Sequence, residues 1–174
     1  MSQISQFWKV DYMIEMKWKV LVVIDESAAG RKAVDCAVDL CLAGFNSKLY
    51  ILYIKDTEPI QLSEEEEKFY GSLIIKANRV LVNTVERLER LKVDFEIIGC
   101  HFGVAVGVAV EEIERVEREL EIDMIIIGAQ KLLSFNRLLG GHYSERMIFE
   151  TKSPVLIVKP EHKSKVEMLT KVKF

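Results

Sequence analysis

The chain has 174 residues, of which 49% are hydrophobic and 29% are charged, and this composition excludes intrinsic disorder and fits one folded domain. Lysine and arginine number 24 against 27 acidic residues, so the net charge of −3 gives no global attraction to nucleic acid or to an anionic membrane. No apolar run reaches the roughly 18 residues of a membrane helix, and the N-terminus lacks the pattern of a signal peptide. Three cysteines without a CxxC motif favour a reducing, cytoplasmic setting.

The first half of the chain predicts a strand, a helix and a second strand. Residues 19–25 (KVLVVID) form an apolar, β-branched run that is typical of a buried strand. Ser27 is a candidate N-cap for the helix that follows, and Gly44 is placed to end it. Residues 49–54 predict the next buried strand.

The second half repeats this alternation. Ser63 and Glu66 form a capping box that predicts a long helix reaching about Leu91, with a buried stripe on one face. The elements expected beyond it are a strand at 94–99, an acidic helix at 111–120, a strand at 123–127, a loop at 129–140, a short helix after Gly141 and a strand at 154–158.

Apolar strands that alternate with helices predict an α/β fold, in which a doubly wound, five-stranded parallel sheet is sandwiched by helices. We place this domain at residues 17–160. Residues 1–16 form an N-terminal extension and residues 161–174 a basic C-terminal tail.

Ligands of such sheets bind outside the carboxyl ends of the strands, and three strand ends are informative. Asp25 follows the first strand, Ile54 ends the second, and Gly128 ends the fourth. The glycine pair Gly140–Gly141 precedes a predicted helix, whose free N–H groups and dipole favour anions. Two interpretations stay open, because glycines are also common in turns and Asp25 could simply cap the following helix.

The segments VLVVIDES (20–27), LYI (52–54) and DMIIIGAQKLLSFNRLLGGHYSERMIFETKSPVLIVK (123–159) resemble the universal stress protein family. The resemblance covers about residues 18–159. It implies a Rossmann-like fold of the adenine nucleotide alpha hydrolase type. It also implies a homodimer joined through the last strand, Pro154–Val158.

The nucleotide-binding branch of that family carries the signature Gly, two residues, Gly, nine residues, Gly, then Ser or Thr. Gly128 and Gly141 match its first and third glycines, whereas Lys131 replaces the second and His142 replaces the hydroxyl residue. The resemblance implies an adenosine half that is retained and a phosphate half that has changed. The implied binding residues are Val23, Asp25, Ile54, Ile127, Gly128, Gln130, Lys131, Arg137, Gly141, His142 and Tyr143.

Three classes of function follow. The resemblance implies a stress-response module that binds ATP or AMP in a weak or altered way, with Mg²⁺ if a triphosphate binds. The alternative is a nucleotide-free dimer that acts as an interaction or scaffold protein. The third class, an ATP-using enzyme, lacks a P-loop and a nucleophile–base arrangement, so we expect no catalytic residues and no ATP hydrolysis. His101 and His162 have no partner at ligand spacing, so we expect no metal site.

Overall fold

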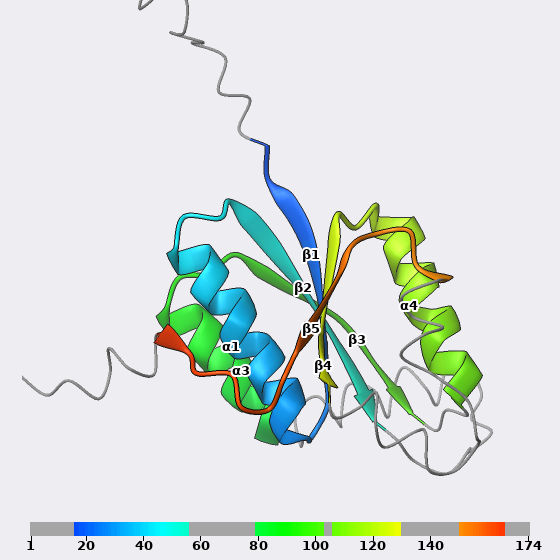
Figure 1. The fold of residues 1–174 in the computed structure, drawn as a ribbon, viewed down its shortest axis with the longest axis horizontal. Helices are drawn as coiled ribbons and strands as arrows, with labels where there is room; N and C mark the ends of the chain where they lie inside the picture. Colours follow the sequence, from blue (N-terminus) through cyan, green and yellow to red (C-terminus); the bar gives the residue numbers. More distant parts are fainter. Residues whose placement is uncertain (1–15, 56–78, 103–105, 130–149, 166–174) are drawn as a thin grey trace, which may run out of the picture.

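The computed structural model describes residues 16–55, 79–102, 106–129 and 150–165, with the side chains of 55, 100–102 and 106–109 left out. Its strands form one parallel sheet in the order β3-β2-β1-β4-β5, covered by helices on both sides (Figure 1). This is the predicted doubly wound α/β architecture. The elements are β1 (Trp18–Ile24), α1 (Ala28–Leu42), β2 (Ser47–Lys55), α3 (Arg79–Arg90), β3 (Phe95–Phe102), α4 (Val106–Leu120), β4 (Met124–Gly128) and β5 (Val155–Val158).

The two faces of the sheet carry separate apolar cores, because successive strand residues point to opposite faces. On one face, Val22, Ile51 and Ile126 pack with the inner sides of α1 and α3. On the other face, Val23 and Ile127 pack with α4. Figure 1 shows α1 and α3 together on one side of the sheet and α4 on the other. Central strands that are buried on both faces explain the unbroken apolar runs in the sequence.

Helix α1 begins and ends as the sequence predicts. The Ser27 hydroxyl accepts a hydrogen bond from the Gly30 N–H at 2.9 Å, which satisfies one of the unpaired donors of the first turn. At the other end Gly44 adopts a φ of +95°, a conformation that costs glycine little.

Helix α4 begins at Val106, five residues before the predicted start. Gly107 interrupts the amphipathic pattern there, and the apolar run 106–110 gives no polar face for the periodicity to reveal. Strand β3 likewise continues to Phe102, beyond the predicted end at residue 99.

Of the long helix that the sequence predicts, the structure describes α3, and the predicted capping box at 63–66 lies outside the described residues. The buried residues of α3 are Leu81, Thr84 and Leu88. The predicted stripe included Val80 in place of Leu81, and the structure leaves Val80 only half-buried. Adjacent residues of an α-helix lie about 100° apart around its axis, so the buried face of α3 is turned relative to the predicted stripe.

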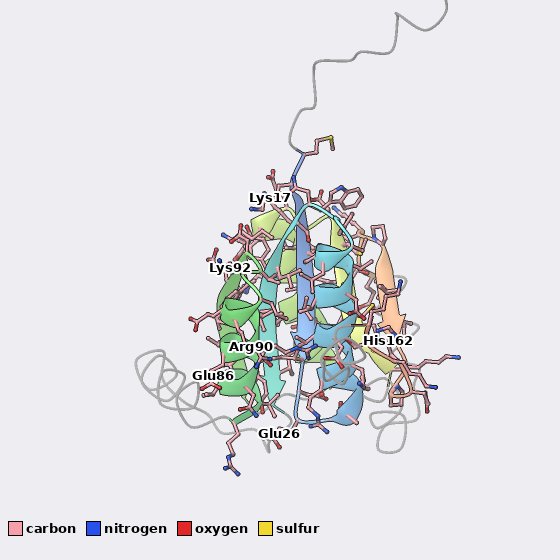
Figure 2. The ribbon with its side chains drawn as sticks, turned by 90° about the vertical axis from the view of Figure 1, so that its left-hand side faces the viewer. Lys17, Glu26, Glu86, Arg90, Lys92 and His162 are labelled. Carbon is pink, nitrogen blue, oxygen red and sulfur yellow. The ribbon has the colours of Figure 1, made fainter. Side chains whose placement is uncertain are left out.

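The segment after β5 lies against α1. The Ser164 hydroxyl, in a residue only 1% exposed, donates to Asp39 Oδ1 at 3.0 Å, and the Lys165 N–H donates to Asp39 Oδ2 at 3.0 Å. Figure 2 shows the neighbouring His162 on the side of α1 that faces away from α3. Residues 161–165, which the sequence predicts only as the start of a basic tail, are therefore tied to the domain.

None of the described helices is long and apolar enough to cross a membrane.

Candidate functional site

The candidate site lies where the carboxyl ends of β1 and β4 meet. From β1 the chain goes on to β2 and β3 on one side, whereas β4 is followed by β5 on the other, so the connections diverge between these two central strands. In open α/β sheets, ligands bind at such switch points. Val23 of β1 pairs with Ile127 of β4. Asp25 comes two residues after Val23 and Gly128 one residue after Ile127, so both lie at the same edge of the sheet. Two of the predicted site residues are thus brought together from positions 103 residues apart.

The Asp25 carboxylate is held by the loop that leads into α1. Its Oδ1 accepts hydrogen bonds from the Ser27 N–H at 3.1 Å and from the Ser27 hydroxyl at 2.6 Å. The same hydroxyl oxygen accepts from the Gly30 N–H, so a short relay joins the strand end to the first turn of the helix. The N-cap of α1 is therefore Ser27, and Asp25 accepts from this residue instead of taking the capping position that the sequence left open. The ligand-binding role of Asp25 stays a prediction.

Two glycines let the first turn of α1 approach the sheet. A Cβ on Gly128 would lie 2.4 Å from the Ala29 carbonyl carbon and 2.7 Å from the Gly30 nitrogen. A Cβ on Gly30 would lie 2.2 Å from Asp25 Oδ1 and 2.9 Å from the Asp25 nitrogen. The sequence predicts the close approach of a ligand at Gly128, and the structure shows the close approach of helix backbone there.

Gly30 is a residue that sequence analysis missed. It stands at the third position of α1, where glycine costs about 1 kcal/mol relative to alanine. The signal in the sequence was a glycine placed three residues after the N-cap, at a position where glycine disfavours the helix.

Three of the predicted binding residues lie on one face of the sheet. Val23, Ile54 and Ile127 come from the carboxyl halves of β1, β2 and β4, and their side chains all belong to the core beneath α4. Their exposed fractions are 2%, 1% and 1%. They form an apolar layer beneath α4 that reaches the carboxyl halves of the strands.

The remaining predicted binding residues follow β4 and lie outside the described residues. They are Gln130, Lys131, Arg137, Gly141, His142 and Tyr143. The phosphate half of the site therefore stays a prediction from the sequence.

Metal and thiol chemistry gain no support from the described part of the chain. It contains no group of three or more His, Cys, Asp or Glu side chains that could hold a metal ion. Cys36 and Cys41 are free thiols on α1, and burial raises the pKa of both. Asp39 and Asp35 raise the pKa of Cys36 further, so its reactive thiolate is disfavoured.

Residues 16–159 match the model of the universal stress protein family. The chain belongs to the universal stress protein family. This assignment agrees with the fold, with the switch point and with the resemblance carried by residues 123–159.

Individual members of the family are distant in sequence. Universal stress protein MJ0531 of Methanocaldococcus jannaschii is 26% identical over 147 residues, which cover 83% of this chain and 84% of the relative. The solved structure of MJ0577 from the same organism superposes with a TM-score of 0.58 at 21% identity, and it covers 85% of this chain and 99% of its own.

A family member from Arabidopsis thaliana was crystallised with AMP bound. It superposes with a TM-score of 0.53 at 17% identity and covers 82% of this chain and 91% of its own. Other solved members are complexes with dAMP and with cAMP. At these identities the structures show that the fold is shared.

Proposed function

We propose that this universal stress protein is a ligand-responsive, non-enzymatic module that binds the adenosine part of an adenine nucleotide at the carboxyl ends of β1 and β4. The observation that carries the proposal is the position of Asp25. Its carboxylate is fixed by Ser27 at the switch point, beside the apolar layer formed by Val23 and Ile127. Adenine nucleotides are bound by several solved relatives, which supports the choice of ligand.

The chemistry divides between the two halves of the ligand. A carboxylate accepts hydrogen bonds from ribose hydroxyls or from an amino group, and an apolar layer packs against the face of an adenine ring. Lys131 and Arg137, together with His142 when protonated, would supply charge-assisted contacts to phosphate in place of the missing glycine and hydroxyl. This arrangement favours adenosine or AMP over ATP, and Mg²⁺ would accompany a triphosphate. We expect no hydrolysis of ATP.

Calorimetric titration with adenosine, AMP and ATP, with and without Mg²⁺, tests the proposal. We expect binding that is weakened at least tenfold by Asp25→Ala. The matched control is Asp94→Ala, which removes an exposed carboxylate that pairs with Lys17 at the opposite end of the sheet. Equal loss in both variants, or no heat with any of the three ligands, would contradict the proposal.

A second proposal is a homodimer joined through β5, with or without nucleotide. In the described sheet β5 is the last strand, and it pairs with β4 alone. Leu156 and Ile157 are 38% and 36% exposed on it, and an apolar edge of this kind needs a cover.

The test of the dimer is the molar mass of the protein in solution. We expect a dimer at micromolar concentration that Ile157→Asp converts to a monomer. Leu42→Asp is the matched control, because Leu42 is a comparably exposed apolar residue at the end of α1. A monomeric wild-type protein would overturn the dimer. A dimer without nucleotide binding would favour the scaffold function.

A further inference from the structure

A hollow of about 230 Å³ lies between α1 and α3, on the face of the sheet opposite α4. Two valines form its apolar lining. Its polar lining consists of Arg31 from α1 and of Arg79, Asn83, Thr84 and Arg87 from α3. Three guanidinium groups and no carboxylate therefore line this hollow, in a chain whose net charge is −3. We call it the arginine groove.

The positive charge of the arginine groove is only partly neutralised. Arg87 forms an ion pair with the buried Asp35, but the same carboxylate also accepts from Lys32 Nζ at 2.9 Å. One carboxylate thus serves two cations. Arg31 donates from Nη1 to the neutral backbone carbonyl of Glu26 at 2.8 Å. Within the described residues, no ion pair includes Arg31 or Arg79.

Helices α1 and α3 present these donors to the same hollow. Arg79, Asn83 and Arg87 recur every four residues, so they follow one face of α3. Arg31 faces them from α1, four residues after the N-cap, and the first turn of α1 carries no acidic side chain. Figure 2 shows the two helices side by side, with Glu26 labelled at the end of the sheet where α1 begins.

We propose that the arginine groove binds a small molecule that carries phosphoryl groups. Guanidinium groups present paired donors that match phosphate oxygens, and several of them suit a ligand with more than one negative charge. The hollow is smaller than the roughly 300 Å³ at which pockets for drug-sized ligands begin, so the ligand is compact. Arg87 is held in place by Asp35 before any ligand arrives, which lowers the cost of ordering it.

The arginine groove is distinct from the proposed adenosine site. It lies on the face covered by α1 and α3, whereas the layer formed by Val23, Ile54 and Ile127 faces α4. The described residues of the two sites do not overlap, so either could bind without the other.

Calorimetric titration with inorganic pyrophosphate, at a constant ionic strength of about 0.15 M, tests the proposal. We expect the variant Arg31→Gln/Arg79→Gln to bind at least about tenfold more weakly, because hydrogen bonds to charged groups are the strong ones. Arg90→Gln is the matched control: Arg90 is an exposed arginine on α3 outside the hollow, and its replacement removes a charge without changing the lining. Arg87 is left intact because its loss would leave Asp35 short of a cation.

Further measurements distinguish this proposal from the adenosine proposal and from a loss of folding. Adenosine binding is expected to be unchanged in the double variant, so failure of one proposal is distinguishable from failure of the other. Melting curves verify that the variants fold, and Arg79→Gln alone gives a milder version of the test. The proposal is overturned if pyrophosphate gives no heat, if Lys131→Ala abolishes binding while the double variant retains it, or if Arg90→Gln weakens binding equally. Citrate binding as tightly as pyrophosphate would overturn the preference for phosphoryl groups.

Discussion

The two ends of the sheet use carboxylates in different ways. At the amino ends of the strands, Glu117 accepts from the N–H groups of Lys152 at 2.9 Å and Ser153 at 2.5 Å, and Asp123 accepts from the Lys19 N–H at 2.8 Å. At the carboxyl ends, Asp25 bonds to Ser27, two residues away. Figure 2 shows the two ends, with Lys17 labelled at one and Glu26 at the other.

This difference separates carboxylates that join distant segments from a carboxylate that organises a local turn. Glu117 is 35 and 36 residues away in sequence from Lys152 and Ser153, so its hydrogen bonds to them contribute directly to the tertiary fold. The two hydrogen bonds that Asp25 accepts from Ser27 lie within one turn, so they contribute to local structure.

The largest expected effect comes from adding a side chain at Gly128, where the backbone of α1 approaches the carboxyl ends of the strands. Gly128→Val would place side-chain atoms against the backbone of Ala29 and Gly30, which cannot yield cheaply. We expect a loss of about 3 kcal/mol in the free energy of unfolding, measured by urea denaturation. The matched control is Gly99→Ala on β3, where a Cβ meets nothing within 4 Å, and it should change stability little. Similar losses in both variants would break this account of the carboxyl end.

The next effect concerns the amino end. Glu117→Ala would leave two backbone N–H groups without their acceptor in a part-buried place, and we expect a loss of about 2 kcal/mol. Urea denaturation measures it, with the exposed Glu121 replaced by alanine as the control. A loss below about 0.5 kcal/mol, the usual range for surface substitutions, would show that Glu117 does not hold the β4–β5 connection.

Asp25→Ala should cost less than Glu117→Ala. It removes the acceptor of a local turn, and we expect a loss of about 1 kcal/mol, comparable to the loss of a helix cap. Parallel denaturation of both variants tests the contrast between the two ends. The comparison fails if Asp25→Ala proves the more destabilising of the two.

The smallest expected effect concerns the reactivity of the Cys36 thiol in the middle of α1. Burial, then Asp39 and Asp35, raise the pKa of the Cys36 thiol, so at a given pH less of the reactive thiolate is present. We expect Cys36 in the folded protein to be alkylated more slowly at pH 8 than in urea-unfolded protein, and its rate to keep rising with pH beyond the ordinary range of a thiol. Peptide-resolved mass spectrometry of iodoacetamide labelling measures both rates. Equal rates in the two states would contradict the raised pKa.

Local signals in the sequence predicted much of the fold. Ser27 and Gly44 mark the ends of α1 through their own chemistry, and the apolar runs of β1 and β4 identify buried strands without reference to the rest of the chain. The start of α4 was predicted too late, because an apolar helical turn carries no amphipathic period.

Features that depend on long-range packing could not be predicted in this way. The bond from Ser164 to Asp39 spans 125 residues, and the steric need for Gly30 arises only once β1 and α1 have met. The arginine groove likewise exists only because α1 and α3 pack side by side. For the candidate site, the strand ends drew attention to Asp25 and Gly128, and the family resemblance added Val23, Ile54 and Ile127. The hydrogen-bond relay through Ser27 required the structure.

The most direct test of the adenosine site is an NMR titration of isoleucine methyl groups with adenosine. Ile54 and Ile127 lie on the face covered by α4, whereas Ile51 and Ile126 lie on the opposite face of the same strands and serve as internal controls. The account predicts that adenosine shifts the methyl resonances of Ile54 and Ile127 in wild-type protein, that Ile51 and Ile126 change little, and that Asp25→Ala removes the shifts. Resonances that stay unchanged at millimolar adenosine, or shifts confined to Ile51 and Ile126, would contradict it.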